Sequence, residues 1–178
     1  MNTPREHIEL VHISLRIPLS VKDSLEKEAR RQHMNLNSLA SKILTKYTSF
    51  DRIAEIVGAV PLNGPLFSTL LEDTPVEHLE QLGKELGSEL IKQTFAFLDL
   101  TYDVDSLVEH YFEPMSSFSS WYMFTIAGSG QNRRLMFKHS RGTNWSAFLR
   151  SYISSIIKAA TGVEPRTSVE KDLVTVYC

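Results

Sequence analysis

The sequence predicts an α+β protein, with a small N-terminal β-α-α unit followed by an α+β domain of packed helices and a small antiparallel sheet. Three observations support this fold class. An alternating strand pattern near the N-terminus leads directly into two amphipathic helical patterns, a stretch rich in Pro and Gly interrupts the chain at 61–65, and helical and strand patterns mix beyond it. We therefore divide the chain into residues 1–50, a helical extension and hinge at 51–65, and a second domain at 66–178.

Charge separates the two parts of the chain. Residues 1–50 hold eight Lys/Arg and five Asp/Glu, whereas residues 51–178 hold eleven and sixteen. The balance of +3 in the first part and −5 in the second gives the overall formal charge of −2. This distribution is the one expected if only the N-terminal part meets nucleic-acid phosphates.

Composition limits the class of protein. A hydrophobic content of 42% over 178 residues is enough to bury a core. The chain has no apolar run of about 18 residues, and its first nine residues lack the apolar stretch of a secretory signal, so we expect a cytoplasmic protein with no membrane contact. The only cysteine, Cys178, excludes an intrachain disulfide and a cysteine-based zinc site.

Residues 9–18 (E-L-V-H-I-S-L-R-I-P) have the period-2 pattern of a half-buried strand. Its apolar face carries Val11, Ile13, Leu15 and Ile17, and its polar face carries His12, Ser14 and Arg16. Pro18 ends the strand because proline cannot donate a hydrogen bond to a neighbouring strand. Ser20 and Asp23 then form an S-x-x-D helix start.

Two helices follow the strand. In the first, Val21, Leu25 and Ala29 recur every four residues along one face, and the helix stops near His33. Asn35 offers a side-chain cap for the second. The apolar stripe of that second helix consists of Leu36, Leu39, Ala40, Ile43, Leu44 and Tyr47.

The strand predicts a dimer, because no sheet partner occurs in the next thirty residues. A lone strand with an apolar face and unpaired edges is a liability in a monomer. Antiparallel pairing of residues 11–17 from two chains would bury both apolar faces on the four helices and expose His12, Ser14 and Arg16 twice on a two-stranded ribbon. We therefore expect a homodimer.

Residues 9–50 resemble the ribbon-helix-helix family, which includes the Arc and MetJ repressors. The resemblance rests on the strand I-S-L-R-I-P, which runs into a charged helix, and on N-L-N-S-L at the start of the second helix. It implies an intertwined dimer that inserts its ribbon into the major groove of double-stranded DNA, where His12, Ser14 and Arg16 touch base edges and Arg16 pairs with guanine. It also implies that the start of the second helix, at Asn35, Asn37 and Ser38, binds a phosphate.

The resemblance thus implies a DNA-binding transcriptional regulator of the repressor type, with a C-terminal domain for assembly or for sensing an unidentified small-molecule effector. One departure is His33, which stands where many members have glycine at the turn between the helices. Two alternatives remain: an ordinary α+β core with the same pattern, and an antitoxin-like interaction module whose DNA-binding part regulates its own synthesis. Assembly beyond the dimer on DNA also stays open.

The second domain begins with a short helix at 66–72, and Pro75 opens a longer one. Residues 95–102 could end that helix or form a strand; as a strand they would complete a split β-α-β unit of ferredoxin type. The remaining predicted elements are a helix at 104–112, a hairpin of strands 121–127 and 133–139, a helix through Trp145 and Ala160 that Gly162 ends, and a last strand at 173–177.

Residues 138–146 (K-H-S-R-G-T-N-W-S) gather His139, Arg141 and Trp145 where a strand leads into a helix, a common place for a ligand pocket. We favour the structural interpretation, in which Trp145 belongs to the core, Gly142 makes the turn, and Thr143 or Asn144 caps the helix.

The sequence contains no pattern typical of a phosphate loop, a metal site or a catalytic centre. Gly128 and Gly130 join two strands without a following helix, so they do not form a phosphate loop. His78, His110 and His139 are isolated, so no metal site is expected. With no nucleophile-and-base arrangement and no cofactor motif, we expect a protein that is not an enzyme and binds no cofactor.

Overall fold

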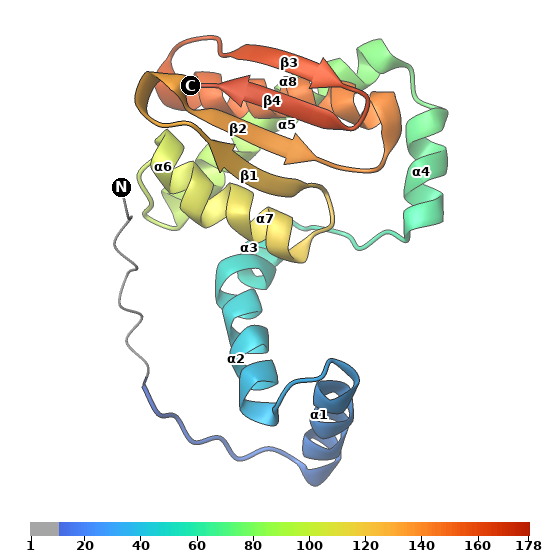
Figure 1. The fold of residues 1–178 in the computed structure, drawn as a ribbon, viewed down its shortest axis with the longest axis vertical. Helices are drawn as coiled ribbons and strands as arrows, with labels where there is room; N and C mark the ends of the chain where they lie inside the picture. Colours follow the sequence, from blue (N-terminus) through green and yellow to red (C-terminus); the bar gives the residue numbers. More distant parts are fainter. Residues whose placement is uncertain (1–10) are drawn as a thin grey trace. The chain divides into compact units, whose positions relative to one another are not determined.

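A computed structural model describes residues 11–178 of the chain. The chain divides into two compact units, residues 1–44, which we call the head, and residues 45–178, which we call the body (Figure 1). Together they contain helices and a small antiparallel sheet, so the α+β class is confirmed. The boundary after residue 44 lies earlier in the chain than the boundary after residue 50 that the sequence predicted.

The head contains α1 (Leu19–Arg31) and the first part of α2 (Leu36–Lys46). Helical structure continues beyond α2 through a π-helical turn, η1 (Tyr47–Asp51), and α3 (Arg52–Ile56), as the pattern after the second helix predicted. The N-cap of α1 is Pro18, which makes no side-chain cap. The S-x-x-D start was therefore wrong: the Pro18 carbonyl already accepts the N–H groups of Val21 and Lys22, which places Ser20 inside the helix.

Residues 11–18 form no strand in the single chain, which corrects the strand predicted for residues 9–18. Residues 9 and 10 lie outside the described residues. The physical reason is that a strand exists only through hydrogen bonds to a neighbour, and no other strand lies in the described part of the head. A ribbon at these residues would therefore require a second chain.

After α3, the body continues with α4 (Gly64–Glu72), α5 (Val76–Phe97) and α6 (Val104–Leu107), followed by a second π-helical turn, η2 (Val108–Phe112), and α7 (Glu113–Phe118). The helix expected at 104–112 is thus present. Residues 95–97 end α5, and residues 98–102 contain no strand. The ferredoxin-type alternative is therefore excluded.

Four antiparallel strands form one sheet in the order β1-β2-β4-β3. They are β1 (Met123–Ala127), β2 (Arg134–Lys138), β3 (Arg166–Glu170) and β4 (Leu173–Tyr177). The β1–β2 hairpin turns through a short 3-10 segment, η3 (Gly130–Asn132). Three of these strands were predicted, whereas the edge strand β3 was missed. Between β2 and β3 lies α8 (Gly142–Thr161), which ends at Gly162 with φ +74°, as predicted.

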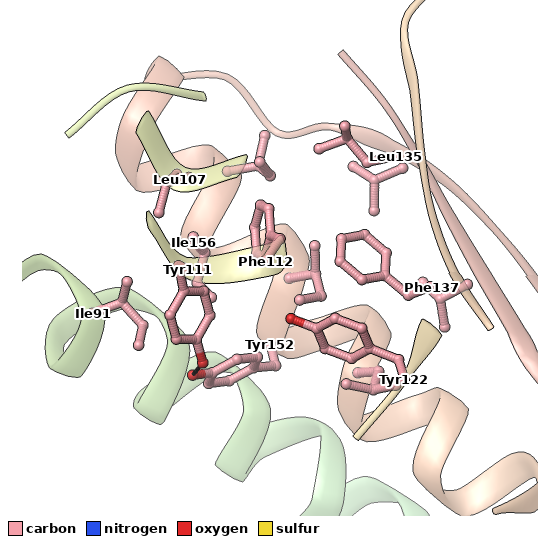
Figure 2. Close-up of a cluster of buried hydrophobic side chains, with 14 of the residues drawn as sticks. Ile91, Leu107, Tyr111, Phe112, Tyr122, Leu135, Phe137, Tyr152 and Ile156 are labelled. Atoms are coloured by element: carbon pink, nitrogen blue, oxygen red, sulfur yellow. Dashed lines mark hydrogen bonds between the residues drawn. The ribbon is translucent and has the colours of Figure 1, made fainter. Parts of the chain in front are cut away.

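The core of the body lies between the sheet and its helices. One face of β2 and β4 presents Leu135, Phe137, Val174 and Val176, all fully buried. In Figure 1, α8 and α5 lie behind the sheet, with α8 in contact with β3 and β4 and α5 packed on α8. Figure 2 shows the centre of this core, where the hydroxyls of Tyr111 and Tyr152 point toward each other at 2.5 Å. Burial raises the pKa of both phenols above the usual range, so they stay protonated.

Candidate functional sites

The apolar residues of the segment before α1 are exposed in the single chain. Val11 is 78% exposed and Leu15 62% exposed, and Ile13 and Ile17 are also exposed. The predicted base-contacting residues His12, Ser14 and Arg16 are exposed as well. Arg16 makes no ion pair with any described residue, so its guanidinium is free of an acidic neighbour in this part of the chain. Both faces of the segment are thus accessible.

The turn between α1 and α2 is a Schellman motif with His33 in the left-handed conformation, φ +54°. The N–H of Met34 donates to the Ala29 carbonyl at 3.0 Å, and the N–H of His33 donates to the Arg30 carbonyl at 3.1 Å. This is the turn geometry for which glycine is usual. The departure at His33 therefore changes the residue but not the shape of the turn.

Asn35 caps α2 as predicted: its side-chain oxygen accepts the N–H of Ser38 at 2.8 Å. In the single chain the Ser38 N–H is therefore engaged by this cap, and the phosphate site predicted at Asn35, Asn37 and Ser38 stays a prediction. The N–H groups of Leu36 and Asn37 have no partner within α2, because the first residues of a helix lack a preceding turn. These two N–H groups remain available as hydrogen-bond donors at the start of α2.

The described part of the head is basic. Residues 11–44 hold six Lys/Arg and three Asp/Glu, a balance of +3. Two of the acids are engaged on α1, where Lys22 pairs with Glu26 at 2.6 Å and Arg31 with Glu28 at 2.7 Å. Hydrogen bonds from Arg31 and Gln32 lower the pKa of Glu28 to about 2. These pairs leave Arg16, Lys27 and Arg30 without an ion-pair partner among the described residues.

His139, one of the three candidate pocket residues, has a buried and fully hydrogen-bonded side chain in the body. Its side chain is 1% exposed, its Nδ1 accepts the Arg141 N–H at 3.2 Å, and its Nε2 therefore donates to Ser146 Oγ at 2.9 Å. The Ser146 hydroxyl in turn donates a hydrogen bond to the Lys171 carbonyl at 2.9 Å. Burial lowers the pKa of His139, with Asp172 opposing the shift, so the ring is neutral near pH 7.

Trp145 is a core residue, as the structural interpretation predicted. Its ring stacks on Phe148 at 4.8 Å between centroids, and its indole N–H donates to the Trp121 carbonyl at 3.1 Å. The predicted cap of α8 was wrong, because neither Thr143 nor Asn144 caps this helix. Instead, Asp172 from the β3–β4 turn accepts the Gly142 N–H at 2.9 Å. Asn144 is used elsewhere, since it donates to the Leu71 carbonyl at 2.8 Å.

Arg141 differs from the other two because it lines a cavity of about 840 Å³ in the body. The walls come from the end of α2, η1, α3, the segment 57–62, the start of α4, the middle of α5, η2, α7 with the residues just after it, and Tyr152 of α8. Phe50 and Phe118 face each other across 6.0 Å between ring centroids. The sequence pointed to Arg141 but not to this cavity, because its walls are assembled from segments far apart in the chain.

Several other expectations concern absences. No helix within residues 11–178 is long and apolar enough to cross a membrane. Over the same residues, no group of three or more His, Cys, Asp or Glu is placed to hold a metal ion.

Comparison of the chain with protein-family models, curated proteins and solved structures finds no match. The resemblance of residues 9–50 to ribbon-helix-helix proteins therefore rests on the residues of this chain alone.

Proposed function

We propose that this protein is a sequence-specific DNA-binding transcriptional regulator whose head dimerises into a β-ribbon that enters the major groove. The observation that carries the proposal is the exposed apolar surface of the head. Among its described residues, the buried hydrophobic residues are Ala29 and Leu39 alone. The exposed large hydrophobic residues include Val11, Ile13, Leu15, Ile17, Leu19, Val21 and Ile43.

A unit of this size buries little apolar surface on its own. Domains near or below about 40 residues usually need a metal, disulfides or association to fold, and the head, which ends at residue 44, contains no cysteine. Its apolar residues lie on the segment 11–17 and on one side of each helix. A second copy is the partner that matches this pattern, because antiparallel pairing of two such segments places four apolar residues of each chain against the helices.

The same antiparallel pairing determines on which face the polar residues of the segment lie. Side chains alternate along a strand, so burial of the odd-numbered positions directs His12, Ser14 and Arg16 to the opposite face. A two-stranded ribbon fits the major groove, and arginine makes a bidentate contact to guanine there. The unpaired arginines of the head and the free N–H groups of Leu36 and Asn37 suit phosphate contacts. The body would serve assembly or effector sensing.

Binding of a duplex by the full-length protein, measured as fluorescence anisotropy against salt, tests this proposal. Phosphate neutralisation makes affinity fall steeply with salt, by roughly a hundredfold between about 50 and about 200 mM for four phosphate contacts. For a site obtained by in vitro selection, Arg16→Ala should cost about 1–3 kcal/mol and relax the preference at one base pair. The matched control is Arg134→Ala, an exposed arginine of the body, which should bind as the wild type does. A flat salt response would contradict the proposal.

A further inference from the structure

The cavity in the body combines a largely apolar wall with two cationic side chains, Arg141 and Lys46, of which only Lys46 has an acidic partner among the described residues. Its wall includes Phe50, Phe67, Phe118 and Trp121. Its volume of about 840 Å³ lies within the range of roughly 300–1,000 Å³ that small-molecule sites occupy. A cavity of this kind takes a largely apolar molecule, and the polar groups at its edge decide which one.

Arg141 is held in place at this cavity by two contacts. Its Nη2 donates to the Ser120 carbonyl at 3.2 Å, and its guanidinium carbon lies 5.0 Å from the centre of the Phe67 ring. A guanidinium has five N–H donors, so most of its hydrogen-bonding capacity remains after these contacts. Both contacts orient the planar group before any ligand arrives, which reduces the entropy cost of binding.

The charge of Arg141 is not neutralised within the described residues. None of their carboxylates lies within ion-pair distance of it, and the acid in the cavity wall, Asp51, pairs with Lys46 at 3.0 Å. A guanidinium beside aromatic walls attracts an anion more strongly than one in open water, because low-dielectric surroundings weaken screening. Carboxylate is the anion whose two oxygens match the guanidinium fork.

We propose that this cavity binds an apolar carboxylic acid, with its carboxylate on Arg141 and its hydrocarbon part between the aromatic side chains. The role of this acid as an effector rests on the proposed function of the protein, whereas the binding site itself does not. The walls formed by η1 and α3 belong to the segment that follows α2 along the chain. A bound acid would therefore contact the part of the body that directly follows α2.

Isothermal titration of the full-length protein with 1-naphthylacetate and with its neutral analogue 2-(1-naphthyl)ethanol tests the proposal. The acid should bind at least about tenfold more tightly than the alcohol, because only the acid forms charge-assisted hydrogen bonds. Arg141→Met should remove this preference while the alcohol still binds. Arg134→Met, on the exposed sheet surface, is the matched control and should keep it.

The site of binding is checked by amide chemical shifts of the wild type, which needs no variant to fold. The acid should shift the amides of Phe50, Ala54 and Ser120 and leave those of Met136 and Thr175 in the sheet unchanged. Equal binding of acid and alcohol, no binding of either, or shifts elsewhere would each overturn the proposal. These titrations contain no DNA, so their failure is separate from a failure of the DNA-binding test.

Discussion

At the turn between α1 and α2, a histidine adopts a backbone conformation that usually selects glycine. His33 has φ +54°, and both hydrogen bonds of the Schellman motif form around it. An L-residue in this region costs about 1–2 kcal/mol, a cost that tertiary structure has to offset. The sequence identified His33 as unusual and Asn35 as a cap, because both signals depend only on neighbouring residues. The cap of α8 by Asp172 was not predictable in that way, since it comes from 30 residues further along the chain.

His33→Gly should stabilise the helix pair of the head. Glycine adopts positive φ without steric cost, and the gain is reduced by the greater freedom of glycine in the unfolded chain, so we expect about 0.5–1 kcal/mol. Hydrogen exchange of the α1 and α2 amides should slow about two- to fivefold. Gln32→Gly is the control: Gln32 has φ −89°, so glycine there should speed exchange. Faster exchange in His33→Gly would contradict this account of the turn.

At the scale of elements, the body depends on a close crossing of α5 and α8. Gly83 and Gly87 are buried on α5, and a Cβ at Gly83 would lie 2.7 Å from the Phe148 carbonyl oxygen and 2.9 Å from the Tyr152 nitrogen. The Ser155 hydroxyl donates to the Lys84 carbonyl at 2.9 Å across the same contact. Glycine is required here for the approach of two backbones rather than for an unusual φ.

Gly83→Ala should destabilise the body, although alanine is about 1 kcal/mol more favourable than glycine within a helix. The clash is with backbone atoms that cannot move independently, and overpacking of this kind costs about 1–3 kcal/mol. Thermal unfolding followed by circular dichroism should show a clear drop in Tm. Gly64→Ala at the start of α4 is the matched control, because a Cβ there meets nothing within 4 Å, and its Tm should change little. Equal Tm values for the two variants would show that the crossing tolerates a methyl group.

Elements with a strong apolar period were predictable, and those shaped by tertiary contacts were not. The sequence predicted α8, whose buried residues recur at helical spacing, and the β1–β2 hairpin, in which Leu135 and Phe137 of β2 are buried at alternate positions. It missed β3 because R-T-S-V-E is an edge strand with mostly exposed side chains and no apolar alternation. Phe95–Tyr102 stayed ambiguous because its apolar residues fit both periods. The helix ends there in a turn in which Asp99 has φ +56° and the Leu100 N–H donates to the Phe95 carbonyl at 2.9 Å.

At the scale of the whole molecule, the two units differ in how completely they bury their apolar residues. The body encloses a continuous core of helices and sheet, whereas the described head buries two hydrophobic residues and exposes a whole segment of them. Sequence patterning predicted this segment and its polar face, but the predicted strand would need a second chain. We therefore propose that two heads pair through residues 11–17 and present Arg16 to DNA.

The pairing is tested most directly by a disulfide across the ribbon. In antiparallel pairing of residues 11–17, Ser14 lies opposite itself, and directly opposed Cα atoms are about 4.5–5.5 Å apart, within disulfide range. Ser14→Cys in a Cys178→Ser background should give a covalent dimer on mild oxidation, and Ser24→Cys, exposed on α1, should give little. Our account predicts rapid cross-linking of the full-length Ser14→Cys protein alone. Cross-linking no faster than that of Ser24→Cys, with a monomer mass of 20.2 kDa in solution, would contradict it.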